Sequence, residues 1–274
     1  MPPIANAPRL TAASSEAMRQ IGIVDELGVR RSIYIPAERP LTVLLDDREL
    51  VTLMTLGASP ELLVLGFLFN QRLIQNAAAI ESIAVDWTSG TAAVRTRGRG
   101  SPRDISAATR PVASASGQGS IFSRLLSEID TIRLPGAAEA RIRRSSLRNL
   151  LEAMRQHDSI HRLARSVHSC ALFQDCRLLV SVEDVSRHNA LDTISGWMAL
   201  HGIDGSDKVL FTTGRLTGEM VIKAAQSGVP IFVSRNGVSA MGYELAKKLG
   251  MALFGRAVNR RFHCYVGEER LESD

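Results

Sequence analysis

Apolar and polar positions alternate with two different periods along this chain, and its first part combines strand and helix patterns. Residues 40–56 hold two apolar stretches around Asp46-Asp47, which predicts two strands joined by a turn. Ser59 and Pro60 then predict a helix start, with Ser59 as N-cap and Pro60 at the first helical position. The helix that follows, ELLVLGFLFNQRLI, is apolar nearly all round, so we expect it to be buried. Two further strands are predicted at 80–86 and 91–95.

From residue 161 onward, short apolar stretches alternate with helical stretches of about ten residues. This alternation predicts βαβ units and a sheet in which most strands are parallel. The fold class that we predict is α/β: a mixed, largely parallel sheet flanked by helices, with a smaller N-terminal α+β lobe. The expected strands are 177–182, 208–211, 230–233, one starting at 252–254, and 262–266, and the expected helices are 188–200, 218–226 and 241–249.

Composition divides the chain into five parts. Residues 97–120 are rich in Gly, Ser, Arg and Ala without apolar periodicity, which is typical of a loop or linker. The predicted parts are a flexible leader at 1–28, the N-terminal α+β lobe at 29–96, the Gly/Ser/Arg loop at 97–120, connecting helices over 121–160 (at about 120–130 and 144–156), and an α/β ligand-binding domain at 161–274.

The charge and the cysteine content narrow the class of protein. The formal net charge of +5 favours anionic partners such as phosphates, nucleotides or nucleic acid, although a mild positive excess also serves solubility. No apolar run is long enough to span a membrane, and the first residues lack the apolar region of a secretory signal. Cys170, Cys176 and Cys264 are widely spaced, so we expect neither a disulfide framework nor a metal site, and we expect the reducing cytoplasm.

Candidate chemistry follows the predicted strands. In an open α/β sheet the ligand lies beyond the carboxyl ends of the strands, and each of four such segments here is polar and contains arginine. Helix N-termini beside arginines suit phosphate, so these segments predict a site for a phosphate-bearing ligand. Polar loops with surface arginines are also common without a ligand. The candidates are Glu183, Asp184, Arg187, His188, Asn189, Thr213, Gly214, Arg215, Ser234, Arg235, Arg256, Asn259, Arg260 and Arg261.

The densest of these segments leaves its role open. A carboxylate beside His and Arg can hold a ligand, tune a proton transfer or lock a loop, and Asp192 can pair with His188 at i,i+4 spacing. The chain has no GxGxxG after a strand, no GxxxxGK[ST] and no HxE with PCxxC. It is therefore neither an ordinary Rossmann or P-loop protein nor a zinc-dependent deaminase.

The segment 182–192, VEDVSRHNALD, resembles the EDxGRHNAxDK signature of the FdhD family, the formate dehydrogenase accessory proteins. Further stretches match in the same order. They are Leu65-Gly66-Phe67-Leu68 (LGFL), Val167-His168-Ser169 (GGxHxA), residues 213–221 ((T/S)GRxSxEMV), Lys223-Ala224, Gly228-Val229-Pro230, and Leu253-Phe254-Gly255 (LVGF).

The resemblance implies a function. Family members are cytoplasmic, bind the bis-molybdopterin guanine dinucleotide form of the molybdenum cofactor, and pass sulfur to it from a cysteine desulfurase before it enters formate dehydrogenase. Their fold is similar to cytidine deaminases without the zinc, and they tend to be homodimers. The implied partners are the formate dehydrogenase catalytic subunit, a cysteine desulfurase and cofactor-synthesis enzymes, with no membrane and no nucleic acid, and GDP is the fragment analogue of the cofactor.

The resemblance also implies which residues contact the cofactor. The stretch after the LVGF strand maps onto Arg256, Ala257, Val258, Asn259, Arg260 and Arg261, the fourth segment found above. The predicted cofactor-binding residues are this stretch with His168, Glu183, Asp184, Arg187, His188, Asn189, Thr213, Gly214, Arg215, Ser234 and Arg235.

One departure from the family concerns sulfur. The family carries persulfide on a CGxCG loop, but the matching stretch here is Ser116-Gly117-Gln118-Gly119-Ser120, and neither serine nor glycine carries persulfide sulfur. We therefore interpret the chain as a cofactor-binding chaperone of formate dehydrogenase. The alternatives are an active sulfurtransferase that uses Cys170, two residues after His168, or a partner's cysteine, and a basic nucleic-acid-binding protein. Cys264 alternates with Phe262 and is expected in the core of a strand.

Overall fold

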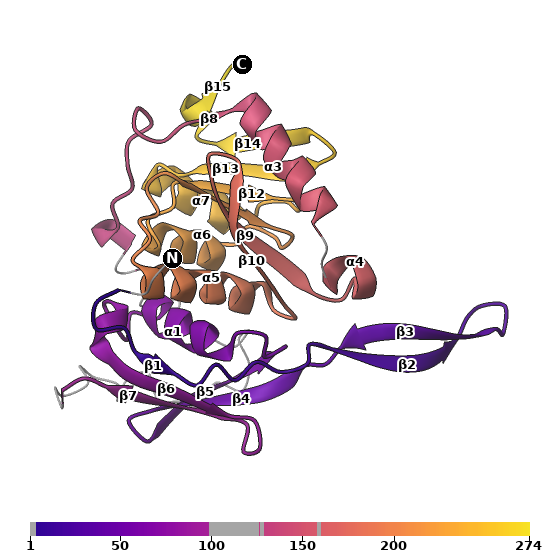
Figure 1. Cartoon of the computed structure of the whole chain (residues 1–274). Coiled ribbons are helices and arrows are strands. Elements are labelled where there is room, and N and C mark those ends of the chain that lie inside the picture. The colour runs from indigo at the N-terminus through magenta and orange to yellow at the C-terminus, as the bar shows by residue number, and fades with distance from the viewer. Residues whose placement is uncertain (1–3, 99–125, 127–128, 158–159) are drawn as a thin grey trace.

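The N-terminal lobe is a five-stranded sheet covered by one helix (Figure 1). The computed structural model describes residues 4–98, 126, 129–157 and 160–274. The sheet has the order β1-β6-β7-β4-β5, and the helix is α1. The bounds are β1 (Arg9–Leu10), β4 (Arg39–Leu45), β5 (Arg48–Thr55), α1 (Pro60–Asn70), the short 3-10 helix η1 (Ala77–Ala79), β6 (Ile80–Asp86) and β7 (Thr91–Thr96).

The sequence predictions for this lobe are confirmed at the strands and at the helix. Asp46 and Asp47 both have positive φ, 47° and 68°, as a two-residue hairpin turn of the type that matches strand twist requires. The helix α1 begins at Pro60 as expected, and it is buried on nearly all sides because it lies between its own sheet and the C-terminal lobe.

The prediction of a flexible leader over residues 1–28 is wrong where the structure shows strands. Arg9 and Leu10 pair in parallel with β6, and β2 (Met18–Val24) pairs with β3 (Arg30–Pro36) as an antiparallel hairpin. The alternation in MRQIGIV produces a strand only because RRSIYIP returns beside it. Part of the predicted leader therefore belongs to the lobe, because β1 pairs with β6 and the Ser15 amide donates to the carbonyl of Gly57.

The C-terminal lobe is built on a six-stranded sheet of order β10-β9-β11-β12-β13-β14. The pairs β11–β12 and β12–β13 are parallel, whereas the pairs β10–β9, β9–β11 and β13–β14 are antiparallel. The prediction of a mixed α/β sheet is confirmed, but only two of the five neighbouring strand pairs are parallel, because β9 and β14 run opposite to the other four strands. The bounds are β9 (His168–Gln174), β10 (Arg177–Asp184), β11 (Lys208–Thr212), β12 (Ile231–Ser234), β13 (Ala252–Val258) and β14 (Arg261–Val266).

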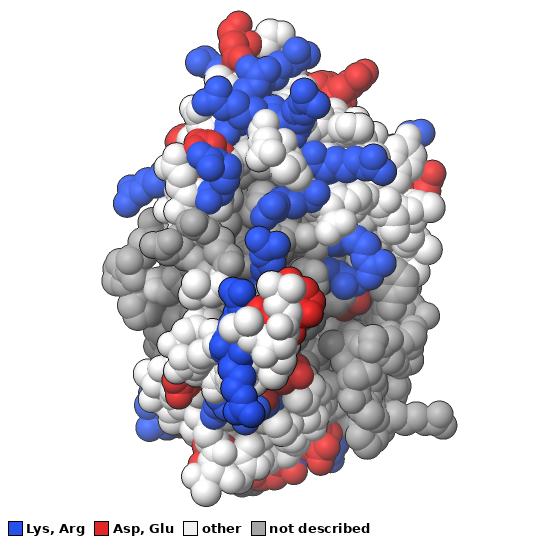
Figure 2. Space-filling model, turned by 90° about the vertical axis from the view of Figure 1, so that its right-hand side faces the viewer, with Lys and Arg blue, Asp and Glu red and all other residues white. Residues whose placement is uncertain are grey.

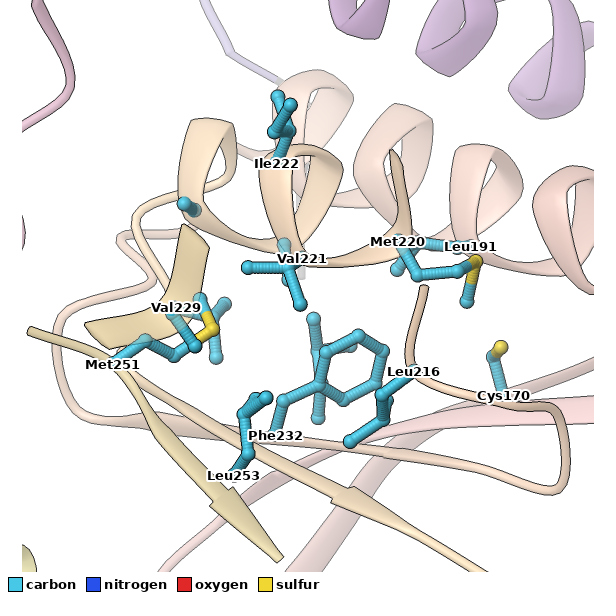
Figure 3. Close-up of a cluster of buried hydrophobic side chains, with 14 of the residues drawn as sticks. Cys170, Leu191, Leu216, Met220, Val221, Ile222, Val229, Phe232, Met251 and Leu253 are labelled. Atoms are coloured by element: carbon cyan, nitrogen blue, oxygen red, sulfur yellow. The ribbon is translucent and has the colours of Figure 1, made fainter. Parts of the chain in front are cut away.

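Helices cover both faces of this sheet (Figure 1). On one face lie α5 (Arg187–His201), α6 (Gly218–Gln226) and α7 (Ala240–Leu249), whose apolar side chains meet Phe232 and Leu253 of the sheet (Figure 3). On the other face α3 (Arg144–Gln156) packs Leu147 and Leu150 against Phe173. The remaining elements are η3 (Ile129–Thr131), β8 (Ile142–Arg143), α4 (Ile160–Ala164), η4 (Glu268–Arg270) and β15 (Leu271–Glu272).

The connecting segment is confirmed in part. The helix expected at 144–156 is α3, and most of the helix expected at about 120–130 lies outside the described residues, as do residues 99–120 of the predicted loop. No helix in the described ranges combines the length and the apolar character needed to cross a membrane.

The two lobes meet where α1 crosses α5 (Figure 1). Two glycines permit a close backbone approach, because a Cβ atom at Gly66 would lie 1.7 Å from the carbonyl oxygen of Asp192 and one at Gly196 would lie 1.9 Å from that of Leu62. The amide Nδ2 of Asn70 donates to Asp192 Oδ1 over 2.7 Å across this crossing. Residue types with larger side chains could not pack at this distance, so the helix pair fixes how the lobes sit together.

Candidate functional site

The carboxyl ends of β10, β11, β12 and β13 lie at one edge of the sheet, because these four strands run in the same direction. Hydrogen bonds join the segments that follow the strands. The Ser234 hydroxyl donates to the carbonyl of Gly214 (2.5 Å), Asn236 Nδ2 donates to the carbonyl of Thr213 (3.2 Å), and the Arg256 amide donates to the carbonyl of Asn236 (2.8 Å). The structure therefore brings together the segments that the sequence singled out.

Positive charge collects at this edge. The side chains of Arg215, Arg235, Arg256, Arg260 and Arg261 are exposed. Figure 2 shows the side of the molecule that carries the edge, with Lys and Arg gathered over the upper and central parts of the face. Five exposed guanidinium groups on adjoining segments make a surface that attracts phosphate-bearing ligands.

Arg187, which follows β10, is less exposed than these five arginines. Its aliphatic stem lies against Gly214, where an added Cβ atom would be 2.7 Å from Arg187 Cδ, so only glycine leaves room for it. Burial, and the nearby positive charge of Arg215, lower the pKa of the half-buried Arg187 guanidinium. Within the described part of the chain its buried Nε atom has no hydrogen-bond partner. A buried donor beside a second cation is best satisfied by an anion.

The fourth predicted segment is a β-hairpin. We expected β13 to end near Phe254 and a loop to follow, but β13 continues to Val258 and turns at Asn259 and Arg260, which have φ values of 49° and 69°. Pairing with β14 extends β13, and a lone apolar pattern did not show that extension. Within the stretch Ala257 is buried, whereas Val258 and the arginines point outward. The hairpin therefore presents Arg260 and Arg261 at its turn and Arg256 on β13.

Two predicted site residues join the lobes. Asp184 is buried and its Oδ2 accepts from the Thr55 hydroxyl (2.5 Å) and from the Leu56 amide (3.2 Å) of the N-terminal lobe. Asn189 is also buried, and its Nδ2 donates to Asp184 Oδ1 (2.9 Å) and to the carbonyl of Met54 (2.7 Å). Burial raises the pKa of Asp184. The side chains of Asp184 and Asn189 therefore form hydrogen bonds between the two lobes, beneath the charged edge.

Glu183 organises the start of β9. Its Oε1 accepts from the Ser169 hydroxyl (2.6 Å) and its Oε2 from the amide of Ile160 at the start of α4 (2.5 Å). Thr213 acts on the same strand, because its hydroxyl oxygen accepts from the Ser169 amide (2.9 Å). These contacts hold β9, and with it His168, beside the ends of β10 and β11.

A row of ionisable side chains runs inward from His188. Its Nδ1 lies 3.6 Å from Glu219 Oε2, Glu219 Oε1 lies 3.5 Å from Lys223 Nζ, and Lys223 Nζ donates to Asp192 Oδ2 over 2.8 Å. The prediction that Asp192 pairs with His188 is therefore wrong, because the buried Lys223 ammonium and Asn70 take both of its carboxylate oxygens.

His188 is a neutral imidazole in this setting. Burial, with the positive charges of Lys223 and Arg187 and the nearby His168, lowers the pKa of His188 to about 2. Glu219 and Lys223 were recognised from the sequence only as positions of two family motifs, the (T/S)GRxSxEMV segment and the Lys-Ala pair after it. That match was the signal that these residues have a role. The structure shows that their side chains form ion pairs within α6 and between α6 and α5.

The structure places Cys170 in the core and Cys264 at the surface. Cys170 is fully buried in the core of Figure 3, its Sγ donates to the Thr212 hydroxyl oxygen (3.2 Å), and burial raises its pKa to about 12. A reactive cysteine has the opposite properties, exposure and a lowered pKa. Cys264 is exposed, so its expected place in a strand core is wrong. It lies on the edge strand β14, whose pairing with β13 is irregular at two places, so alternation there does not follow burial. The stretch Ser116–Ser120 lies outside the described residues.

Fold and edge together define a two-lobed α/β protein with an arginine-rich surface at the carboxyl ends of a mixed sheet. Residues 36–272 match the model of the FdhD/NarQ family, and the chain belongs to this family. The family predicted from the sequence signature is thereby confirmed.

Curated relatives agree with this assignment. A sulfur carrier protein FdhD of Halalkalibacterium halodurans is 28% identical over 252 residues, which cover 92% of this chain and 93% of the relative. Its namesake in Bacillus subtilis is 29% identical over 234 residues, covering 85% and 88%. A crystal structure described as that of a formate dehydrogenase accessory protein from Desulfotalea psychrophila has a TM-score of 0.74 and 26% identity, covering 93% of this chain and 98% of that one. The predicted likeness to cytidine deaminases stays a prediction.

Proposed function

We propose that this protein is an accessory protein of formate dehydrogenase maturation that binds bis-molybdopterin guanine dinucleotide at the carboxyl edge and delivers it to the catalytic subunit. The observation that carries the proposal is that four arginine-bearing strand ends lie at one edge of the sheet, where Arg187 Nε has no hydrogen-bond partner among the described residues. Family membership supplies the accessory role, and the edge supplies a surface that suits the phosphates of the cofactor.

The residues present fit such a ligand in charge and in hydrogen-bonding capacity. Each guanine dinucleotide half carries a diphosphate, and the exposed Arg215, Arg235, Arg256, Arg260 and Arg261 can bind phosphate oxygens in pairs. When bound, the cofactor supplies the molybdenum centre that the acceptor enzyme needs for its redox chemistry. The chain's own contribution is to bind and orient: Arg187 donates from its buried Nε, and the neutral His188 stands beside it without adding charge.

The proposal and its main alternative differ in whether this protein itself transfers sulfur. Ser116 and Gly119 stand where the family has the cysteines of CGxCG, and Cys170 is buried with a raised pKa. We therefore propose a carrier that delivers the cofactor without holding persulfide itself. In the alternative, this protein is a sulfurtransferase that uses a cysteine of its own or of a partner, such as the cysteine desulfurase. We place the protein in the cytoplasm, as a homodimer, beside the enzymes that make the cofactor.

A bound pterin is the direct test of the binding function. The full-length protein would be purified from a molybdenum-replete host, and released pterin would be measured by its fluorescence after oxidation. Calorimetry with GDP then localises the site. We expect Arg260→Ala/Arg261→Ala to weaken GDP binding by about 1–3 kcal/mol, the scale of a charge-assisted hydrogen bond. Arg9 is an exposed arginine of the N-terminal lobe that is paired with Glu81. The Arg9→Ala variant should leave the affinity for GDP unchanged.

Two results would overturn the proposal. Absence of pterin together with equal GDP affinity of the three proteins would remove the cofactor site from this edge. Binding of DNA or RNA that falls steeply with salt, in place of nucleotide binding, would favour the nucleic-acid alternative. Replacing all three cysteines by alanine separates carrier from sulfurtransferase: the carrier keeps formate dehydrogenase maturation in cells that lack the native gene, and a sulfurtransferase that uses its own cysteine loses it.

A further inference from the structure

A hairpin arm projects from the body of the molecule (Figure 1). It consists of β2 and β3, residues 18–36, in a continuous antiparallel register from Met18 opposite Pro36 to Val24 opposite Arg30. Among the described strands, β2 and β3 pair only with each other. A two-stranded hairpin without a further layer is marginally stable in water, so an extended arm of this length needs a reason in function or in partner contacts.

The turn at the end of the arm is held in one conformation by Asp25. Its Oδ1 accepts from the amides of Leu27 (3.0 Å) and Val29 (2.9 Å), and its Oδ2 accepts from Arg31 Nε (2.5 Å). The hydrogen bond from the Val29 amide lowers the pKa of the Asp25 carboxyl, which keeps it ionised for these contacts. An ordered turn loses little further conformational entropy when it binds.

This ordered turn presents apolar side chains to solvent. Val24 is 63% exposed, Leu27 is 77% exposed and Val29 is 49% exposed. One face of the arm continues the apolar surface, because Ile21 lies opposite Ile33 and strand alternation puts Ile23 and Ile35 on the same side. Grouped apolar residues on a projecting element mark an interaction surface more often than scattered ones do.

The arm lies on the same side of the molecule as the basic edge. In Figure 1 it points to the side where α4 and the start of β9 lie, and in Figure 2 it projects toward the viewer from the face where Lys and Arg gather. Its strand β3 contacts α4, and the first amide of α4 donates to Glu183 at the end of β10. A protein that takes the ligand from the edge therefore meets the arm.

We propose that the hairpin arm docks the protein that accepts the ligand, by placing Leu27 and Val29 in an apolar groove that is rimmed by carboxylates. This inference rests on the proposed function, which supplies an acceptor. The charge favours an acidic partner over a second copy of this chain, because two copies that met through this face would bring their arginine clusters together. The exposed Arg30 beside the turn then faces acidic groups of the acceptor, whereas Arg31 is paired with Asp25.

The test measures binding between full-length proteins. The probe is the formate dehydrogenase catalytic subunit of the same organism, produced in cells that cannot make the molybdenum cofactor. We expect Leu27→Ser/Val29→Ser to weaken its binding tenfold or more, as loss of central apolar anchors does. GDP affinity should not change, because neither residue lies at the basic edge. The wild-type complex should also weaken as salt is raised.

Matched variants exclude an effect of fold or of surface polarity alone. Leu27→Met keeps an apolar side chain at the turn and should keep binding, and Met54→Ser makes an equivalent change at an exposed residue of β5 and should also keep it. Equal binding of the subunit by wild type and by the Leu27→Ser/Val29→Ser variant overturns the docking role of the arm. A change in sedimentation of the variant alone, without a change in binding, assigns the arm to self-association and equally overturns it.

Failure of the proposed function gives a different pattern. If the wild-type protein binds neither GDP nor the catalytic subunit, the function itself is wrong. If it binds both and the arm variants behave as wild type, only the docking role is wrong.

Discussion

The crossing of α1 and α5 makes a prediction in which local propensity and packing have opposite signs. Gly196 lies inside the helix α5, where alanine is favoured over glycine by about 1 kcal/mol. A Cβ atom there would lie 1.9 Å from the carbonyl oxygen of Leu62, on backbone that no side-chain rotation can move. Since real Cβ contacts stay beyond about 3 Å, Gly196→Ala must separate the helices by about 1 Å.

That separation has a further cost at Asn70. Its 2.7 Å hydrogen bond to Asp192 would lengthen beyond the range of a hydrogen bond. Overpacking costs about 1–3 kcal/mol and a hydrogen bond to a charged group about 1.5–3 kcal/mol, so after the gain in propensity we expect a net loss of about 1.5–5 kcal/mol.

Urea unfolding followed by circular dichroism measures this loss directly. Gly22→Ala is the control, because nothing lies within 4 Å of a Cβ atom at that position, and it should leave the free energy of unfolding nearly unchanged. If Gly196→Ala matched or exceeded the wild-type stability, propensity would outweigh packing and the account of the lobe joint would be wrong.

Three further predictions concern buried charge and cysteine. Because the pKa of His188 is about 2 in the fold and the unfolded imidazole takes up a proton below about 6.5, stability present above pH 6.5 is lost as the pH falls, by about 2 kcal/mol at pH 5. His188→Gln should flatten this part of the curve of unfolding free energy against pH, and parallel curves would refute the assignment. Lys223→Met leaves Asp192 with an unpaired buried charge, so we expect a loss of about 3–5 kcal/mol in urea unfolding, part of which Asp192→Asn added to it restores. Iodoacetamide followed by mass spectrometry should label Cys264 in the native protein and Cys170 only after denaturation, and native labelling of Cys170 would contradict its burial.

Local signals in the sequence were sufficient for several elements. Pro60 after Ser59 located the start of α1, and Asp46-Asp47 located a turn, because backbone restrictions at these residues act over a few positions. The strand β9 was missed, since HSCALFQ contains neither β-branched residues nor alternation, and it is a strand because β10 and β11 pair on either side. The arm was missed for a related reason: each of its strands depends on the other.

The candidate site was predicted as a set of segments, and its internal geometry was not. The shared direction of the strands brings Arg187, Arg215 and Arg235 to one edge of the sheet. The position of these arginines could therefore be predicted from the topology. Spacing along α5 suggested a pair between His188 and Asp192, but Lys223 from α6 takes that carboxylate. The choice between two partners depends on tertiary distance, which spacing along one helix does not contain.

The lobe joint also limits how relatives of this protein can exchange parts. Gly66 and Gly196 allow α1 and α5 to pack closely across the boundary between the lobes. The Asp184 carboxylate of the signature segment accepts a hydrogen bond from Thr55 of the other lobe. A chimera that takes its first lobe from one relative and its second from another would keep both sheets intact and still fail at the seam, unless the small residues at both positions came with it. We therefore expect the two halves to be exchangeable between relatives only together with the residues that meet at the joint.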